Sequence, residues 1–94
     1  MKILRVGIAG YGVVGKKRKK FIDQNKKFNI VAISDISFKK KIKQKKKIFL
    51  IQNYKSLFDF NLDVIFICLP NRFASEATIL ALKNNVHIFC EKPP

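Results

Sequence analysis

Apolar residues in this chain gather in short blocks, which are separated by glycine, proline, asparagine or runs of lysine. Five blocks have the length and the content of β-branched and aromatic residues that strands favour. Some of them are apolar at nearly every position, which is typical of strands covered on both faces of a parallel sheet. The pattern predicts strands over residues 2–10, 28–34, 48–52, 62–70 and 86–90.

Between these blocks the apolar spacing changes to that of helices. Residues 13–27 and 72–85 predict two longer helices, and the second is the clearer because its apolar residues recur three or four positions apart. Asn84 and Asn85 predict its end. The expected core contacts are Val13, Val14, Phe21 and Ile22 in the first helix, and Phe73, Ala77, Leu80 and Ala81 in the second.

Two further segments flank the third strand. Residues 54–60 predict one or two helical turns with Ser56 as the cap, and the lysine-rich residues 38–47 are compatible with a frayed helix or a loop. Strand and helix thus alternate along the chain, which indicates right-handed βαβ units. We expect an α/β fold: a doubly wound, Rossmann-like parallel sheet of five strands in the order 3-2-1-4-5, with three αβα layers. Ligands of such sheets bind at the switch point, here between the first and fourth strands.

The loop after the first strand has the sequence GYGVVG, with glycines at 10, 12 and 15. Gly10 allows a sharp turn, Gly12 allows close approach of the backbone to a pyrophosphate, and Gly15 allows the helix to pack tightly on the strand. A strand before the motif and a helix after it are the context that makes the pattern informative. We expect a dinucleotide phosphate to bind here, at a loop that also contains Tyr11, Val13 and Val14.

Asp35 ends the second strand, twenty residues beyond Gly15. A carboxylate in this place accepts hydrogen bonds from an adenosine ribose and repels a 2′-phosphate, so NAD is expected in preference to NADP. Lys39 and Lys40 follow closely and would offset part of that repulsion. The structural alternative is that the glycines only make a tight turn and that Asp35 only caps a loop.

The net charge of +14 is confined to residues 1–47, because residues 48–94 are balanced. Such an excess is compatible with nucleic-acid binding, but 17 of the 20 basic residues are lysine rather than the bidentate arginine. A solvated basic face is the commoner explanation. No apolar run reaches the roughly twenty residues that span a membrane, so we expect a cytoplasmic protein. Cys68 and Cys90 have neither zinc-site nor CxxC spacing, and no metal site is expected.

Two later segments strengthen the assignment to a dinucleotide-binding fold. CLPNRFA at residues 68–74 and ALKNNVHIFCEKP at residues 81–93 both reach the carboxyl ends of predicted strands. Together with GIAGYGVVG at residues 7–15, they make the chain resemble the N-terminal nucleotide-binding domain of the Gfo/Idh/MocA oxidoreductases. The resemblance runs from Lys2 to Pro94.

This resemblance implies hydride transfer between a nicotinamide cofactor and a sugar, a polyol or a related secondary alcohol. It implies that Leu69, Pro70 and Asn71 line the edge of the cofactor cleft and that Glu91 contacts the nicotinamide ribose. Lys92 would be the catalytic residue, at the hydroxyl of the reacting carbon, and would also belong to the cofactor site.

The family has a second, substrate-binding domain, so we expect residues 1–94 to be an incomplete dinucleotide-binding domain without turnover of its own. A fifth strand with an exposed apolar edge also makes a homo-oligomer an expectation. Two alternatives remain from the sequence: a stand-alone, non-catalytic dinucleotide-binding module, and a basic nucleic-acid-binding protein.

Overall fold

The apolar blocks form one sheet in the computed structural model, which describes residues 2–39 and 42–90. The strand order is β3-β4-β2-β1-β5-β6, and all neighbours are parallel except β3 and β4. The five parallel strands confirm the predicted order 3-2-1-4-5 and the doubly wound fold. The strands are β1 (Leu4–Ala9), β2 (Phe28–Ser34), β3 (Ile42–Lys45), β4 (Ile48–Ile51), β5 (Val64–Ile67) and β6 (His87–Cys90).

The prediction for the lysine-rich segment is wrong over residues 42–45, because β3 is neither a helix nor a loop, whereas residues 38–39 and 46–47 belong to no helix or strand. It pairs with β4 as an antiparallel hairpin, in which Lys45 lies opposite Ile48. Lys46 and Lys47 connect the two strands with φ values of 50° and 67°. Two residues with positive φ make the turn whose twist matches a hairpin. Backbone pairing with β4 therefore decides the conformation of a segment whose side chains favour no particular element.

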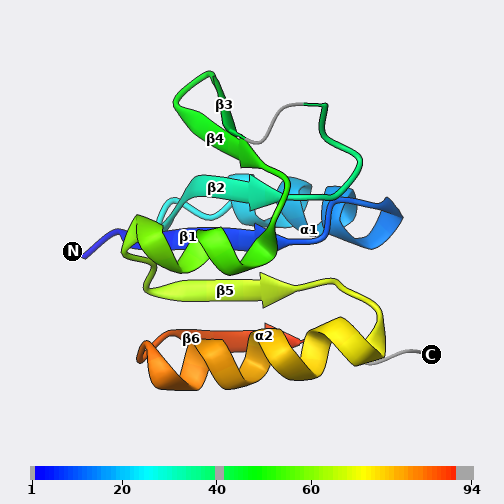
Figure 1. Ribbon diagram of the computed structural model, residues 1–94. Helices are drawn as coiled ribbons and strands as arrows, with labels where there is room; N and C mark the ends of the chain where they lie inside the picture. Colours follow the sequence, from blue (N-terminus) through cyan, green and yellow to red (C-terminus); the bar gives the residue numbers. More distant parts are fainter. Residues whose placement is uncertain (1, 40–41, 91–94) are drawn as a thin grey trace.

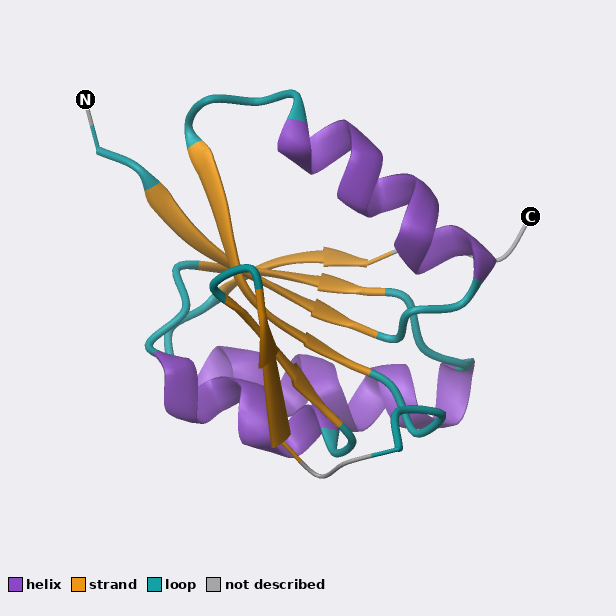
Figure 2. Cartoon of the chain, turned by 90° about the horizontal axis from the view of Figure 1, so that it is seen from above, coloured by secondary structure: helices purple, strands orange, loops and turns teal. Residues whose placement is uncertain are grey.

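Helices cover both faces of the sheet (Figure 1). Helix α1 (Val13–Asp23) lies on one face, and the 3₁₀ helix η1 (Tyr54–Phe60) and helix α2 (Asn71–Lys83) lie on the other, as Figure 2 shows. This arrangement confirms the three expected layers.

Helix α1 is shorter and less buried than predicted. It ends at Asp23, and its buried residues are Gly15 and Ile22, two turns apart. Of the other expected core contacts, Val13 is 73% exposed and Phe21 is 56% exposed, and Val14 is also exposed. The helix thus packs on the sheet along a narrow line.

The cap of η1 also differs from the prediction. Asn53 rather than Ser56 is the cap, since the Asn53 side chain accepts a hydrogen bond from the N–H of Lys55 at 2.9 Å. Ser56 instead donates its N–H to the carbonyl of Asn53 at 3.0 Å.

Helix α2 follows its predicted period with a different set of buried residues. Ala77 and Ala81 are buried as predicted and Ala74 joins them, whereas Leu80 is only half-buried. Phe73 is 39% exposed and lines a cavity at the end of the sheet instead of filling the core. The helix ends as predicted, because Asn85 has a positive φ of 56° and the N–H of Val86 donates to Ala81.

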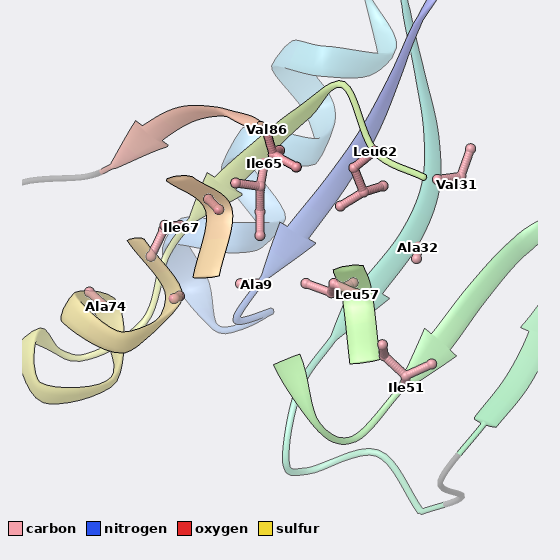
Figure 3. Close-up of a cluster of buried hydrophobic side chains, with 12 residues drawn as sticks. Ala9, Val31, Ala32, Ile51, Leu57, Leu62, Ile65, Ile67, Ala74 and Val86 are labelled. Atoms are coloured by element: carbon pink, nitrogen blue, oxygen red, sulfur yellow. The ribbon is translucent and has the colours of Figure 1, made fainter. Parts of the chain in front are cut away.

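The alternating side chains of β1 and β5 divide the core into two clusters. Ile8 and Phe66 face α1, and Ala9 and Ile67 face η1 and α2. The cluster on the side of η1 and α2 is the larger, and Figure 3 shows how Leu57 of η1 and Ala74 of α2 approach the strands. The carboxyl ends of β1, β2 and β5 are held by this packing.

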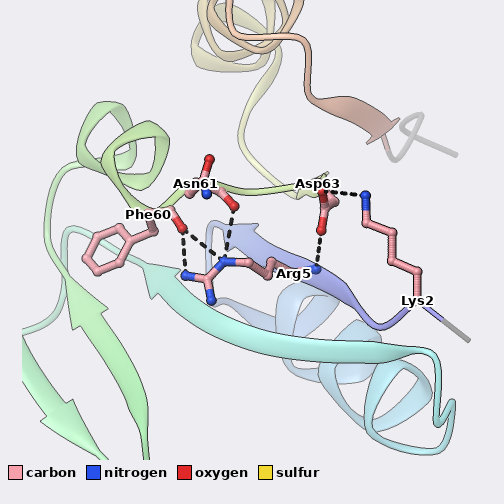
Figure 4. Close-up of polar contacts among 5 residues, drawn as sticks. All are labelled: Lys2, Arg5, Phe60, Asn61 and Asp63. Carbon is pink, nitrogen blue, oxygen red and sulfur yellow. Dashed lines mark hydrogen bonds and ion pairs between the residues drawn. The ribbon is translucent and has the colours of Figure 1, made fainter.

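The opposite end of the sheet is fixed by Arg5 and Asp63 (Figure 4). The N–H of Arg5 donates to the Asp63 carboxylate at 2.8 Å, and the N–H of Asp63 donates to the Arg5 carbonyl, also at 2.8 Å. The Arg5 guanidinium donates to the carbonyls of Phe60 and Asn61, and Lys2 pairs with Asp63 at 3.6 Å. The Arg5 N–H is the main reason why the pKa of Asp63 is lowered.

We predict that Asp63→Asn lowers the melting temperature at pH 7 but has a smaller effect near pH 3. A carboxyl group whose pKa is lower in the folded state stabilises the fold above its unfolded pKa of about 3.8. That stabilisation is lost as the pH falls through the folded value. Thermal melts of both proteins across this range test the prediction, with Asp59→Asn in η1 as a control for loss of charge. A difference in melting temperature that does not shrink in acid would contradict it.

Candidate dinucleotide-binding site

A cavity of about 310 Å³ lies at the carboxyl ends of β1, β2 and β5. Five of the cofactor-binding residues predicted from the sequence line it, and they come from three separate loops. This is the switch point of the sheet, where β1 has β2 on one side and β5 on the other. The lining residues are Gly10, Gly12, Asp35, Ile36, Tyr54, Cys68, Leu69, Pro70 and Phe73.

The three glycines of the turn have three different environments. Gly10 has a φ of +94°, and a Cβ there would lie 2.6 Å from the carbonyl oxygen of Cys68. A Cβ on Gly15 would overlap the carbonyl oxygen of Gly10. Gly12 has no atom within 4 Å of an added Cβ. Gly10 and Gly15 are therefore required by the fold itself, whereas Gly12 faces open space.

Backbone hydrogen bonds hold the turn against both neighbouring strands. The N–H of Gly10 donates to the carbonyl of Ser34 in β2 at 2.9 Å. The N–H of Cys68, after β5, donates to the carbonyl of Ala9 in β1 at 2.8 Å. Helix α1 begins directly after Gly12, which offers no side-chain cap, and its first turn contains no acidic residue. The first N–H groups of a helix have no partner within the helix. The positive end of α1 therefore begins next to the cavity.

The Asp35 carboxylate is directed back to the glycine turn. One oxygen accepts a hydrogen bond from the N–H of Tyr11 at 2.7 Å, and the other accepts one from the N–H of Ser37 at 2.9 Å. Asp35 thus does cap its own loop, as the structural alternative supposed. The bond to Tyr11, 24 residues earlier, is not explained by a loop cap alone.

The charge of Asp35 is kept on the carboxylate by its partners. Partial burial, the largest single influence, would raise the pKa of Asp35. The hydrogen bonds from Ser37 and from the N–H of Tyr11, together with the positive charge of Lys16, outweigh burial, so the pKa lies below its ordinary value. Asp35 is therefore ionised at neutral pH, beside the cavity.

The other predicted residues lie around the cavity or outside the described chain. Tyr11 provides its backbone to Asp35, while its ring packs 6.2 Å from that of Phe38. Val13 and Val14 are exposed at the start of α1, and Asn71 is exposed at the start of α2 without lining the cavity. Glu91 and Lys92 lie outside the described residues.

Four lining residues were missed from the sequence. Ile36 and Cys68 are neighbours of predicted residues, so their positions could have been inferred. Phe73 fits the helical period of α2, which predicts a core position for it. Tyr54 is the first residue of η1, and no local pattern reveals that the start of this helix lies at the cavity. Its hydroxyl donates a hydrogen bond to Glu76 of α2.

Comparison with known proteins agrees with this fold. A family model for Gfo/Idh/MocA, described as an oxidoreductase family with an NAD-binding Rossmann fold, matches residues 4–94. The chain belongs to the Gfo/Idh/MocA family. The resemblance stated from the three sequence segments is thereby confirmed.

Several relatives act on inositols, according to their names. Myo-inositol 2-dehydrogenase of Thermotoga maritima is 29% identical over 94 residues, which cover 96% of this chain and 28% of that protein. The solved myo-inositol 2-dehydrogenase of Lactobacillus plantarum has 27% identity and a TM-score of 0.78, over 98% of this chain and 29% of that one.

A second solved structure shares the fold at lower identity. Scyllo-inositol dehydrogenase of Lactobacillus casei, solved with NAD(H) and scyllo-inositol, has a TM-score of 0.79 and 20% identity, over 98% of this chain and 28% of that one. The present chain thus spans less than a third of the length of these three proteins. Within the residues that the structure describes, no helix is long and apolar enough to cross a membrane.

The three glycines allow a matched stability test. We predict that Gly10→Ala and Gly15→Ala each destabilise the fold by about 1 to 3 kcal/mol, because the added methyl group meets backbone atoms. Gly12→Ala should change the free energy of unfolding by less than about 0.5 kcal/mol, since the methyl group enters open space. Chemical denaturation of the three variants measures this. Equal losses in all three would contradict the difference between Gly12 and the other two glycines.

Proposed function

We propose that this chain is the part of a Gfo/Idh/MocA oxidoreductase that binds NAD. The observation that supports this most directly is the junction of the glycine turn and Asp35. The N–H of Tyr11 is bonded to the Asp35 carboxylate, and Gly10, Gly12 and Asp35 line one cavity. The proposed sites for a phosphate and for a ribose would thus be held at a fixed separation.

The pyrophosphate would bind at the start of α1. Helix N-termini attract anions through free N–H groups and the helix dipole. Gly12 leaves room there, and neither a cap nor an acid competes for these N–H groups. Lys16, which already acts on Asp35 electrostatically, would add a positive charge on the same side.

Asp35 would bind the hydroxyls of the adenosine ribose. Each carboxylate oxygen has two acceptor sites, so the bonds to Tyr11 and Ser37 leave acceptor capacity for ribose hydroxyls. A 2′-phosphate would bring a second negative charge close to this ionised group. At about 4 Å such a pair costs roughly 1 to 4 kcal/mol in surroundings between water and a protein surface. NAD is therefore the expected cofactor in preference to NADP.

The reacting end of the cofactor would lie toward the loop after β5 and the end of the sequence. Bound NAD supplies a hydride acceptor at the nicotinamide ring. By family resemblance, Leu69, Pro70 and Asn71 would border the cleft and Glu91 would contact the nicotinamide ribose. Lys92 would lie at the substrate hydroxyl, where a cation favours the developing alkoxide.

The substrate would be a polyol or a sugar, because the names of the relatives specify inositols. Since the chain spans 28% of the Thermotoga protein, most substrate contacts would come from residues other than these 94. We expect residues 1–94 alone to bind NAD without catalysing hydride transfer.

Gly12 allows a direct test of this function. We predict that Gly12→Val abolishes NAD binding while the melting temperature stays within a few degrees of the parent, since the larger side chain fills the space proposed for the pyrophosphate. Isothermal titration calorimetry with NAD measures the binding, and Gly12→Ala serves as the smaller matched change. Unaltered NAD affinity in Gly12→Val would refute the proposed site, as would the absence of NAD binding by the parent chain.

Cofactor preference depends on the charge of Asp35. We predict that Asp35→Asn raises the affinity for NADP relative to NAD by roughly tenfold or more, because the repulsion of the 2′-phosphate is removed. Parallel titrations with both cofactors measure the ratio, and Asp59→Asn controls for the loss of one negative charge elsewhere. An unchanged ratio would show that Asp35 does not face the 2′ position.

A further inference from the structure

Two aromatic side chains, Tyr54 and Phe73, form one wall of the cavity, called the aromatic wall below. A hydrogen bond outside the cavity connects this wall to Glu76 of α2. Tyr54 and Phe73 both line the cavity, with ring centroids 6.3 Å apart and ring planes inclined by 58°. The Tyr54 hydroxyl donates to a carboxylate oxygen of Glu76, and the Lys55 ammonium lies 3.4 Å from that oxygen. Glu76 itself does not line the cavity.

The Tyr54 hydroxyl and the Glu76 carboxylate differ in charge state at neutral pH. The hydrogen bond from Tyr54 is the main cause of the lowered pKa of Glu76, and the same bond raises the pKa of Tyr54 to about 12. A neutral phenol therefore donates to an ionised carboxylate. Hydrogen bonds of this charge-assisted kind are stronger than those between neutral groups.

The position of Tyr54 in η1 explains why its ring needs such an anchor. It is the first residue of the 3₁₀ helix, and its side chain is only half-buried. The ring packs against the buried cluster of this face, but its aromatic neighbour Phe73 is 39% exposed, so packing restrains the ring from one side and leaves the other facing the cavity. The bond to Glu76 links the Tyr54 ring to α2, in addition to the packing of Leu57 and Ala77 in the same cluster.

The wall has the chemistry of a purine-binding surface. It adjoins Asp35 in the same cavity, and its neighbours Ile36, Leu69 and Pro70 are apolar. A flat base packs well against such aromatic and aliphatic groups. The Tyr54 hydroxyl already donates to Glu76, so the ring would contribute its face to the base.

We infer that Glu76 is a positioning residue, which holds the Tyr54 ring through its hydroxyl as the wall that receives the adenine of the dinucleotide. This inference rests on the proposed function, because it assigns the adenine end of the same cofactor. Loss of the bond would leave the ring free to adopt other rotamers, and ligand binding would then have to restore the competent one.

The experiment is a double-mutant cycle on NAD and AMP affinity with Glu76→Ala, Tyr54→Phe and the combined variant. Each single change should lower the affinity for both NAD and AMP by about three- to tenfold, the range expected for one hydrogen bond. The combined variant should bind both ligands no more weakly than either single variant, because the two changes remove the same bond. Glu76→Gln, whose amide oxygen still accepts, should bind within about twofold of the parent.

Lys55→Ala is the matched control, since it removes the ion pair to Glu76 and keeps the hydrogen bond. It should bind NAD and AMP as the parent does. Melting temperatures of all variants separate positioning from general destabilisation. A merely structural role would lower the melting temperature and leave the affinity of the folded protein unchanged.

The outcomes separate this inference from the proposed function. If the parent chain binds no NAD, the proposed function fails and the inference fails with it. If the parent binds NAD but Glu76→Ala binds equally well, the inference alone is overturned. Additive losses in the combined variant, or a loss in Glu76→Gln equal to that in Glu76→Ala, would also overturn it.

Discussion

The site depends on the backbone at Gly10, where four elements meet without room for a side chain. Its N–H is bonded to β2, its Cα faces the carbonyl of Cys68 after β5, and its own carbonyl lies against Gly15 of α1. The positive φ of this residue turns the chain from β1 into the helix. Because the turn is fixed from three sides, the start of α1 and the ends of β2 and β5 have fixed positions relative to one another.

The same geometry explains how a helix can begin with a run of cations. Such residues oppose the helix dipole at its positive end, and α1 has no acid in its first turn. The structure distributes these charges among different neighbours: Lys16 lies 5.9 Å from the Tyr11 ring, and Lys19 pairs with Asp23 at 2.6 Å. Asp35 supplies a negative charge from the next strand, so the positive end of α1 and this carboxylate border the same cavity.

Much of the fold could be predicted from the sequence, because five apolar blocks and two helical periods determine the order of a parallel sheet. The glycines and Asp35 could be located in the same way, since their spacing along one βαβ unit has a geometric meaning. Tyr54 and Glu76 could not be located, because their contact joins η1 to α2 across 22 residues and depends on how both helices pack. The β3–β4 hairpin was missed because its turn consists of lysines rather than the usual asparagine and glycine.

The two faces of the sheet contribute unequally to the site. On the face of α1, the helix buries Gly15 and Ile22 against the sheet. The Phe89 side chain remains 53% exposed, although its ring stacks on that of Phe66. On the other face, η1 and α2 pack through Leu57 and the alanines of α2 into the larger cluster. The residues of the cavity wall, Tyr54 and Phe73, belong to these two elements. A change that loosens η1 against α2 should therefore affect the part of the cavity lined by Tyr54 and Phe73 first, while the glycine turn, held by backbone contacts to both neighbouring strands, keeps its shape.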